Sequence, residues 1–430
     1  MNTRTYRFIP SFPDEETIRQ TQLEGLRWTV RQARNSPQYR AKLDAVGVQP
    51  EDIQSLEDLR KLPMTTADDL REGYPLPLLC IPEREVVRVH ASSGTTGKRK
   101  ILAYSRNDVA RFGLQMARCY ELAGLDETDR IQVAVGYGLW TAGAGFQAGS
   151  ELFGALTVPV GPGNLDIHLQ LLEDIGSTCF CATASMALLL AEEVERSNII
   201  DRIKLRKLIF GSEACSAKMR RSFEQGLRLE NSYDIGGMTE MYGPGSSIEC
   251  EAHEGLHYWP DLFYMEIVDP VSLQAVPEGQ SGELVVTSLC KEAVPLLRYR
   301  TRDISRLVPG LCSCGLRLPR HDTISARSDD MFIVRGVNIY PGQIMDVLGS
   351  FPELDGEYHI RLLHEQGRDR MLVAVERQRN THIDDEAGLA ARIEEQLQLK
   401  LMVRGQVEIV AHGSLPRTFS KAKRVTDLRE

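Results

Sequence analysis

The chain has 430 residues, of which 42% are hydrophobic and 26% are charged. These fractions are typical of a globular protein and exclude a disordered or fibrous chain. The 51 Lys and Arg residues against 60 Asp and Glu residues give a net charge of −9, so there is no basic surplus to bind a nucleic-acid backbone. We expect about three compact units, or one large domain and a smaller one, that form a soluble enzyme or binding protein without a nucleic-acid partner.

The cysteines and the N-terminus predict a cytoplasmic protein. Nine Cys is an odd number without the spacing of a disulfide framework, which suits a reducing compartment. The first residues lack the apolar segment of a secretory signal. Residues 131–150 carry no charge over a length that could span a membrane. Their five Gly and two Gln instead favour a buried strand that leads into a packed helix, and we expect no membrane segment.

Helical periodicity dominates the first 80 residues, where Leu23, Leu26, Val30 and Ala33 recur at three-to-four spacing. From about residue 85, strands alternate with helices. The pattern predicts strands at 86–92, 101–105, 131–137, 156–161, 178–183 and 207–212, and helices at 105–125, 141–155, 165–176 and 185–197. This alternation predicts an α/β fold whose parallel sheet binds its ligand at the carboxyl ends of the strands.

The pattern changes after about residue 245. Short alternating strands at 255–270 and 281–289 predict a small antiparallel β region. The remainder predicts a compact α+β unit with a strand pair at 331–341, helices at 341–351 and 385–401, and a hairpin at 358–378. We therefore expect a large N-terminal domain, 1–328, and a small mobile C-terminal domain, 329–430, whose relative orientation matters for function.

The sequence ASSGTTGKRK, from Ala91 to Lys100, is the sharpest local feature. Small hydroxyl residues, glycines and the cations that follow make a loop whose backbone N–H groups, hydroxyls and charges can surround phosphate oxygens. It is not a Walker A loop, because the Gly-x4-Gly-Lys-Ser/Thr pattern is absent. An ordinary Ser/Thr/Gly turn is the alternative. The predicted phosphate-binding residues are Ser92, Ser93, Gly94, Thr95, Thr96, Gly97 and Lys98.

Five further segments follow in order: GSEACS at 211–216, DIGGMTEMYGPG at 234–245, RYRTRDIS at 298–305, ARSDDMFIVRGVNIYPGQI at 326–344 and PRTFSKAKRV at 416–425. Together with the phosphate loop they resemble the motifs of the acyl-adenylate-forming (ANL) enzymes, and in particular of the phenylacetate–coenzyme A ligases. The resemblance covers essentially the whole chain.

The resemblance implies roles for the residues of these segments. Glu240 would bind Mg²⁺, Thr239 would serve ATP, and Lys421 would supply a mobile positive charge in the adenylation transition state. Asp303 would accept hydrogen bonds from the ribose hydroxyls, and Asp329 would be the hinge. The other implied nucleotide-binding residues are Gly211, Ser212, Glu213, Asp234, Gly236, Gly237, Met238 and Arg327.

Two further features of the sequence concern the adenine pocket and the acyl pocket. Many relatives carry an aromatic residue at the position of Gly236, where it can stack on adenine. Here the stacking partner is either missing or supplied from elsewhere, with Tyr233 and Tyr242 as candidates. The resemblance places the acyl pocket at Tyr137, Trp140, Ala214 and Gly237. The alternative for the two aromatic residues is a purely structural position in the core. No Asp on these segments could hold an amino group, so an aryl acid is a better substrate than an α-amino acid.

Four separated residues predict a structural zinc site. Cys312 and Cys314 lie in a turn, and Cys250 precedes a predicted hairpin that carries His253 and His257. Three thiolates and one imidazole make a tetrahedral Zn²⁺ site, for which we prefer His257. The alternative is four unrelated reduced side chains.

The sequence thus predicts a ligase that uses ATP, Mg²⁺ and coenzyme A, with a homodimer as a further expectation. An aryl or arylacetic acid would form an acyl-AMP and then a thioester. Two alternatives are an adenylating enzyme that loads a carrier protein or another acceptor, and a nucleotide-binding sensor without turnover.

Overall fold

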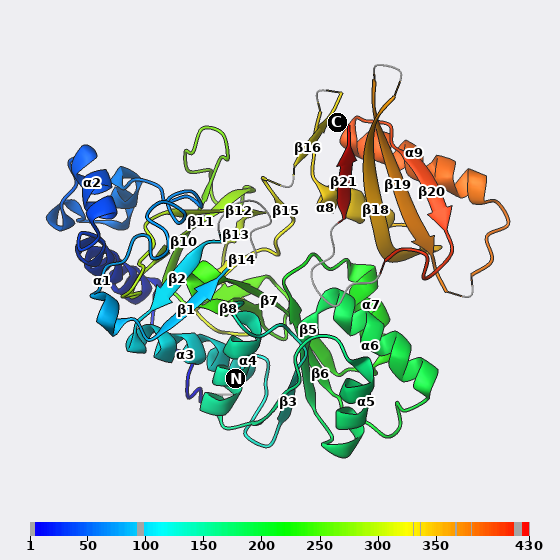
Figure 1. The fold of residues 1–430 in the computed structure, drawn as a ribbon, viewed down its shortest axis with the longest axis horizontal. Coiled ribbons are helices and arrows are strands. Elements are labelled where there is room, and N and C mark those ends of the chain that lie inside the picture. The colour runs from blue at the N-terminus through cyan, green and yellow to red at the C-terminus, as the bar shows by residue number, and fades with distance from the viewer. Residues whose placement is uncertain are drawn as a thin grey trace.

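The computed structural model describes residues 5–92, 99–329, 331–335, 337–365, 368–379, 381–416 and 424–429. Two lobes are visible in Figure 1, with the larger one built from the N-terminal three quarters of the chain and the smaller one carrying α8, α9 and β18 to β21. The predicted combination of a large α/β part and a small α+β part is confirmed.

The chain begins with two helices that cover one end of the large lobe. Helix α1 (Glu15–Ala33) starts at Asp14, whose carboxylate accepts the backbone N–H of Thr17, and it buries Leu26, Val30 and Ala33. Helix α2 (Pro37–Ala45) follows at once. The expectation of mostly helical structure up to residue 80 is only partly met, because beyond α2 the structure has short 3₁₀ helices.

A nine-stranded sheet forms the centre of the large lobe. Its parallel part consists of β3 (Arg130–Val133), β4 (Leu156–Pro159), β5 (Cys179–Thr183), β6 (Lys207–Gly211) and β7 (Asn231–Met238), in the order β7-β6-β5-β3-β4. An antiparallel part continues beyond β7 with β8 (Gly243–Glu249), β9 (Leu256–Tyr258), β14 (Arg320–His321) and β13 (Leu307–Val308). The strands predicted as a separate small region therefore divide, since β8 and β9 extend the parallel sheet.

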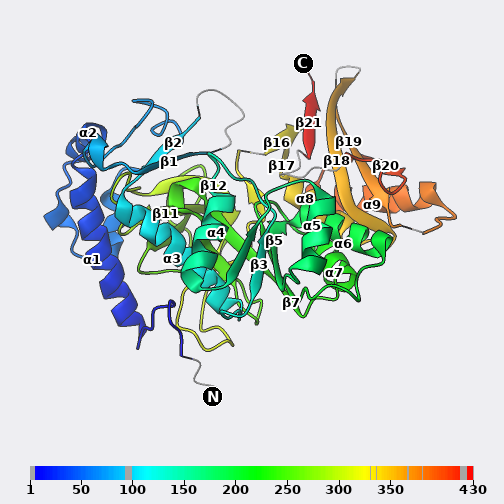
Figure 2. The same ribbon diagram turned by 60° about the horizontal axis from the view of Figure 1, so that its bottom comes forward.

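Helices cover both faces of the parallel strands (Figure 2). Cys179, Cys181 and Ile209 belong to the core that includes α3 (Arg106–Leu122) and α4 (Ala142–Phe153). The alternate residues of the same strands point into the other core, with α5 (Leu165–Asp174), α6 (Ala184–Ser197) and α7 (Ala217–Gly226). Because both faces are buried, β5 and β6 are apolar almost throughout.

The uncharged stretch 131–150 contains β3 and most of α4, as its composition predicts. Gly149 allows the close packing of α4 on α3, since a Cβ at this position would lie 2.3 Å from Met116 Cβ. Within the described ranges, no helix is both long enough and apolar enough to cross a membrane.

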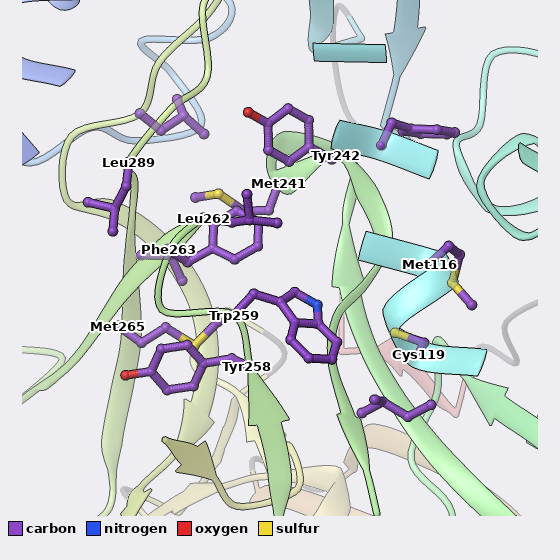
Figure 3. Close-up of a cluster of buried hydrophobic side chains, with 14 of the residues drawn as sticks. Met116, Cys119, Met241, Tyr242, Tyr258, Trp259, Leu262, Phe263, Met265 and Leu289 are labelled. Carbon is purple, nitrogen blue, oxygen red and sulfur yellow. The ribbon is translucent and has the colours of Figure 1, made fainter. Parts of the chain in front are cut away.

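A second, antiparallel sheet lies beside the first. It contains β10 (Phe263–Val268), β11 (Gly282–Ser288), β12 (Tyr299–Ser305) and β15 (Ala326–Arg327). Figure 3 shows the buried cluster in which Phe263 and Trp259 meet Met116 of α3 and Tyr242. The indole N–H of Trp259 donates to the carbonyl of Gly245 at 2.7 Å. This core therefore supports the turn between β7 and β8 from beneath.

The small lobe has its own hydrophobic core, made of residues between 332 and 407. The hairpin of β16 (Phe332–Val334) and β17 (Val337–Ile339) leads into α8 (Pro341–Leu348). A four-stranded sheet in the order β20-β19-β18-β21 follows, made of β18 (Leu354–Glu365), β19 (Arg368–Arg377), β20 (Gln406–Val410) and β21 (Val425–Leu428). Helix α9 (Glu386–Leu401) buries Leu389, Ile393, Leu397 and Leu401.

The small lobe lies against the large lobe on the side of α6 and α7 (Figure 1), and polar contacts join the two there. The Lys218 ammonium donates to the carbonyl of Pro352 at 2.9 Å, and Arg379 pairs with Glu195 at 3.0 Å. The pair of Arg379 and Glu195 is largely exposed, so it contributes little to the free energy that holds the lobes in this orientation. His412 also lies 3.7 Å from Glu192 across the same boundary, where both side chains are only partly exposed.

Candidate active site

The carboxyl ends of the parallel strands bring the predicted nucleotide residues together. Strand β6 ends at Gly211, where a Cβ would lie 2.4 Å from the carbonyl oxygen of Ile235 on β7. Ser212 has a φ of +72°, which turns the chain sharply out of the sheet. The carboxylate of Glu213 then accepts the backbone N–H of Ser185 at 2.6 Å, which ties the loop to the start of α6. Ala214 lies exposed on this loop.

Glu240 lies in the turn that follows β7 and is the most constrained carboxylate of the site. Its side chain is 5% exposed. The Lys100 ammonium lies 2.5 Å from Glu240 Oε1, and the Tyr299 hydroxyl donates to the same oxygen at 2.9 Å. Burial opposes ionisation of Glu240, but Lys100 and Tyr299 outweigh it and hold the pKa of this carboxyl below its usual value. The site therefore presents a buried negative charge that requires a cation beside it.

Two side chains from outside the turn donate hydrogen bonds to its backbone. The Tyr104 hydroxyl donates to the carbonyl of Thr239 at 2.7 Å, and the Lys291 ammonium donates to the carbonyl of Glu240 at 2.8 Å. Burial lowers the pKa of Lys291 to about 8. Both carbonyls are thus fixed by side chains from outside the turn.

The glycines of this loop are required by its close packing. A Cβ on Gly236 would lie 2.2 Å from Ser247 Oγ, and a Cβ on Gly237 would lie 2.5 Å from the carbonyl oxygen of Gly243. Strand β8 therefore occupies the space that a larger side chain at Gly236 would need. Met238, the last residue of β7, is partly buried.

The two tyrosines considered as stacking partners for adenine do not lie on the surface of the site. Tyr233 and Tyr242 are both 0% exposed. Tyr242 packs among Tyr104 and Phe263, with ring centroids 6.5 and 6.0 Å away. Because protein atoms enclose both rings, the expectation that one of them stacks on adenine is wrong for this conformation.

A chain of charges links the predicted ribose site to the predicted hinge. Arg327 Nη1 donates to Asp303 Oδ1 at 2.7 Å, from β15 to β12. The same guanidinium makes two hydrogen bonds of 2.9 Å to the carboxylate of Asp329. The arginine therefore bridges Asp303 and Asp329 in this conformation.

Tyr137 and Trp140 come from the loop between β3 and α4. Both rings are partly exposed, and each lies against a glycine: a Cβ on Gly143 would lie 2.6 Å from the Tyr137 ring, and one on Gly136 would lie 2.8 Å from the Trp140 ring. Their partial exposure distinguishes them from the fully buried aromatic residues of the core.

The predicted phosphate loop joins β1 (Arg88–Ala91) to β2 (Ile101–Tyr104). Ser92 closes the hairpin by donating its N–H to the carbonyl of Lys100 at 3.2 Å. Ser93, Gly94, Thr95, Thr96, Gly97 and Lys98 lie outside the described residues, as does Lys421.

The four predicted zinc ligands converge beside β8 and β9, since Cys250 directly follows β8 and His257 lies on β9. The ligand atoms of Cys250, His257, Cys312 and Cys314 all lie within 4.8 Å of one another. Sγ of Cys250 is 3.5 Å from Sγ of Cys312, and Sγ of Cys314 is 3.5 Å from Nε2 of His257. His253 lies elsewhere, between Asn231 and Glu249, so the geometry selects His257 over the alternative.

Three residues of the site were missed by the sequence reasoning. Lys100 has a signal, because it follows the phosphate loop, but nothing in the sequence indicates that Glu240 is its partner. Lys291 and Tyr299 follow Glu240 by 51 and 59 residues along the chain. Only the fold brings them to the turn.

Comparisons with known proteins place this geometry in a family. The model described as "AMP-binding enzyme" matches residues 17–290, and the model described as "AMP-binding enzyme C-terminal domain" matches residues 336–429. The chain belongs to the AMP-binding enzyme family. The predicted adenylate-forming family is thereby confirmed.

Curated relatives match over nearly the whole length. The chain is 41% identical over 420 residues to the phenylacetate-coenzyme A ligase of Pseudomonas putida, which covers 96% of this chain and 95% of that protein. It is 39% identical over 422 residues to the ligase of the same name from Escherichia coli (strain K12), with 96% and 95% covered. These similarities support an AMP-forming acid–CoA ligase activity.

Solved structures add information on conformation. A 2-hydroxyisobutyryl-CoA ligase in the postadenylation state, in complex with R3-HIB-AMP, has a TM-score of 0.88 at 29% identity over 97% of this chain and 91% of that one. The same ligase in the thioesterification state, with 2-HIB-AMP and CoA, has a TM-score of 0.71 at 30% identity, with 98% and 91% covered. The lobes described here are therefore arranged more like those of the postadenylation state.

Asp234 provides a pH-dependent prediction. Burial, with the negative charge of Glu249 nearby, raises the pKa of this carboxyl to about 7 despite Arg220. Between about pH 4 and pH 7, Asp234 is protonated in the folded state but ionised in the unfolded state. The free energy of unfolding therefore falls as the pH rises through this range. Asp234→Asn should therefore raise the free energy of unfolding by about 1 kcal/mol or more at pH 8, and by much less at pH 4.5. Denaturant unfolding at both values measures this, and an equal effect at both would contradict the assigned shift.

Proposed function

We propose that this chain activates phenylacetate, or a closely related aryl acid, with ATP and transfers the acyl group to coenzyme A. The observation that carries the proposal is the 41% and 39% identity, over nearly the full length, to proteins named phenylacetate-coenzyme A ligase. The buried carboxylate at the carboxyl end of the sheet supports it independently, since ligands of open α/β sheets bind there.

Glu240 is the residue proposed to bind Mg²⁺. A carboxylate oxygen is a ligand that this hard cation prefers. In the structure the Lys100 ammonium already provides a cation at Glu240 Oε1, which supports a site built for positive charge. Bound Mg²⁺ would neutralise phosphate charge during attack on the α-phosphorus.

The remaining nucleotide contacts are proposed on the same basis. The phosphate loop from Ser92 to Lys98, together with Thr239, would bind the β- and γ-phosphates. Asp303 would accept hydrogen bonds from the ribose hydroxyls. Arg327, which pairs with Asp303, would hold that carboxylate in place. The adenine-side loop would consist of Gly211, Ser212, Glu213, Asp234, Gly236, Gly237 and Met238.

The proposed chemistry has two steps. A carboxylate oxygen of the substrate attacks the α-phosphorus of ATP, and pyrophosphate leaves. The CoA thiolate then attacks the acyl carbon, and AMP leaves. Lys421 would stabilise the negative charge of the first transition state, an effect worth about 10²–10³ in rate for one well-placed donor. Tyr137, Trp140, Ala214 and Gly237 would form the pocket for the aryl group.

The two steps require different groups at one site, so we propose that the C-terminal domain, 329–430, reorients about Asp329 between them. The TM-scores of 0.88 and 0.71 against two states of one ligase support such alternation. The separate hydrophobic core of residues 332–407 supports a unit that moves as one body. Release of Asp329 would require its two hydrogen bonds to Arg327 to break.

We also propose that Cys250, His257, Cys312 and Cys314 bind a structural Zn²⁺. Four protein ligands leave no open position, which suits a structural metal. Nδ1 of His257 lies 3.2 Å from the carbonyl oxygen of Leu318, so a proton on Nδ1 would leave Nε2 free to face the thiolates. The cytoplasmic location and the homodimer remain predictions beside this one.

Metal analysis tests the zinc proposal. Wild-type protein should contain about one zinc per chain, and Cys312→Ser should lose it together with several kcal/mol of stability. Cys290→Ser is the matched control, because Cys290 is partly buried and lies outside the cluster. The proposal would be contradicted if wild-type protein without metal had the same free energy of unfolding as wild-type protein with zinc.

The activity is tested by measuring pyrophosphate release and thioester formation with a panel of acids. Phenylacetate with ATP, Mg²⁺ and CoA should give phenylacetyl-CoA, and without CoA a single turnover should give enzyme-bound phenylacetyl-AMP. We expect aliphatic and α-amino acids to react at least about tenfold more slowly, since a matched aryl pocket is worth 1–3 kcal/mol in discrimination. Adenylation without any CoA thioester would instead favour another acceptor, and no pyrophosphate release would exclude the proposal.

A further inference from the structure

Lys291 is a fully buried lysine that the mechanism above does not use. It lies in the segment between β11 and β12, and its side chain is 0% exposed. Within the described ranges, no carboxylate forms an ion pair with it. Burying an ammonium group without a directly paired carboxylate is costly, although the nearby negative charges of Asp108 and Glu240 offset part of that cost. The presence of Lys291 therefore requires an explanation.

The ammonium group of Lys291 is placed by three neighbours. It donates to the carbonyl oxygen of Glu240 at 2.8 Å. It lies over the rings of Tyr104 and Tyr242, 4.8 and 5.4 Å from their centroids. Two aromatic faces and one carbonyl thus replace the water that the charge loses on burial.

Each of these three neighbours either belongs to the turn that carries Glu240 or is hydrogen-bonded to that turn. Tyr104 also donates to the carbonyl of Thr239 at 2.7 Å. Tyr242 ends the turn with a φ of +67°, a backbone conformation that non-glycine residues seldom adopt. The buried ammonium of Lys291 therefore contacts both the strained turn and the ring of Tyr104, which itself stabilises the turn.

The segment of Lys291 also contacts the carboxylate end of Glu240. Eight residues later, Tyr299 donates to Glu240 Oε1 at 2.9 Å. One stretch of chain thus fixes Glu240 at both its backbone carbonyl and its side chain.

We propose that Lys291 is a positioning residue that fixes the Thr239–Glu240 turn in the geometry needed for acyl-AMP formation. The inference rests on the proposed role of Glu240. Lys291 acts through Glu240 and does not touch the substrate. A methionine would fill the same apolar space but would leave the Glu240 carbonyl without its donor.

A second buried lysine offers a matched control. Lys207 on β6 is 7% exposed, donates to the carbonyls of Ala123 and Gly124 at 2.7 and 2.8 Å, and lies 6.0 Å from the Tyr233 ring centroid. Its carbonyl partners follow α3 and lie away from the Glu240 turn. Lys207→Met therefore reproduces the loss of a buried ammonium without disturbing Glu240.

The test is a double-mutant cycle of Lys291→Met and Glu240→Gln, read by single-turnover formation of phenylacetyl-AMP. We expect Lys291→Met to lower the rate constant at saturating Mg·ATP 10- to 100-fold, with a smaller change in the KM for Mg·ATP. In the Glu240→Gln background the same substitution should cost less than threefold, because residues that act through one group are not additive. Lys207→Met should leave the rate constant within threefold of wild type.

Each contrary outcome identifies what fails. If Glu240→Gln alone leaves acyl-AMP formation intact, the proposed role of Glu240 is wrong and the inference falls with it. If Glu240→Gln impairs the reaction but the two effects multiply, or if Lys207→Met is equally harmful, Lys291 has only a structural role. Lys291→Gln, which keeps a hydrogen-bond donor in place of the charge, serves the same cycle should Lys291→Met not fold. Because this variant keeps a donor for the Glu240 carbonyl, its rate constant should stay within about tenfold of wild type. Its effect should also shrink in the Glu240→Gln background, and two effects that multiply would overturn the proposal.

Discussion

A carboxylate removed from water must be given a positive partner, and the arrangement of this site depends on that constraint. Glu240 is buried at the carboxyl end of the central sheet, where Lys100 and Tyr299 contact the same carboxylate oxygen. Lys291 and Tyr104 fix the backbone beneath it. Lys100 and Tyr104 come from the hairpin of β1 and β2, Lys291 and Tyr299 come from the connection of β11 to β12 in the second sheet, and Glu240 follows β7 of the central sheet. The neutralisation of one charge thus joins three parts of the large lobe.

Close packing explains why the loop beside Glu240 contains glycine. Gly236 and Gly237 let β8 approach β7 so closely that a Cβ would contact Ser247 or the Gly243 backbone. The antiparallel extension of the sheet depends on this approach, and so does the core around Trp259 below it (Figure 3). The absence of an aromatic residue at Gly236 is therefore a consequence of how β8 packs. In the proposed nucleotide site, Gly236 would not supply the stacking partner for adenine that an aromatic residue there would provide.

Much of the fold could be predicted because its signals are local. Alternating apolar strands and amphipathic helices identify the βαβ units, and the hairpin β18–β19 with helix α9 identifies the small lobe. The grouping of Cys250, His257, Cys312 and Cys314 could also be predicted, since these residues are of types that can bind a metal and the sequence places them at suitable intervals. The preference for His257 over His253 could also be stated from the sequence, and the pairing of β8 with β9 agrees with it by placing His257 beside the thiols.

Long-range partners could not be predicted. The pairing of Lys100 with Glu240 spans 140 residues, and no periodicity indicates it. The burial of Tyr233 and Tyr242 was also missed, because a tyrosine next to a nucleotide motif can face the ligand or the core with the same sequence pattern. The division of the predicted antiparallel region between two sheets depends on pairing that composition does not encode.

The most direct test is to locate the metal that accompanies ATP. Crystals grown with phenylacetate, a non-hydrolysable ATP analogue and Mn²⁺ in place of Mg²⁺ would show the ion by its anomalous scattering. We predict Mn²⁺ about 2.1 Å from a carboxylate oxygen of Glu240, with the Lys100 ammonium moved away from that oxygen. An intact pair of Lys100 and Glu240, with Mn²⁺ bound to the analogue but not to Glu240, would contradict the account.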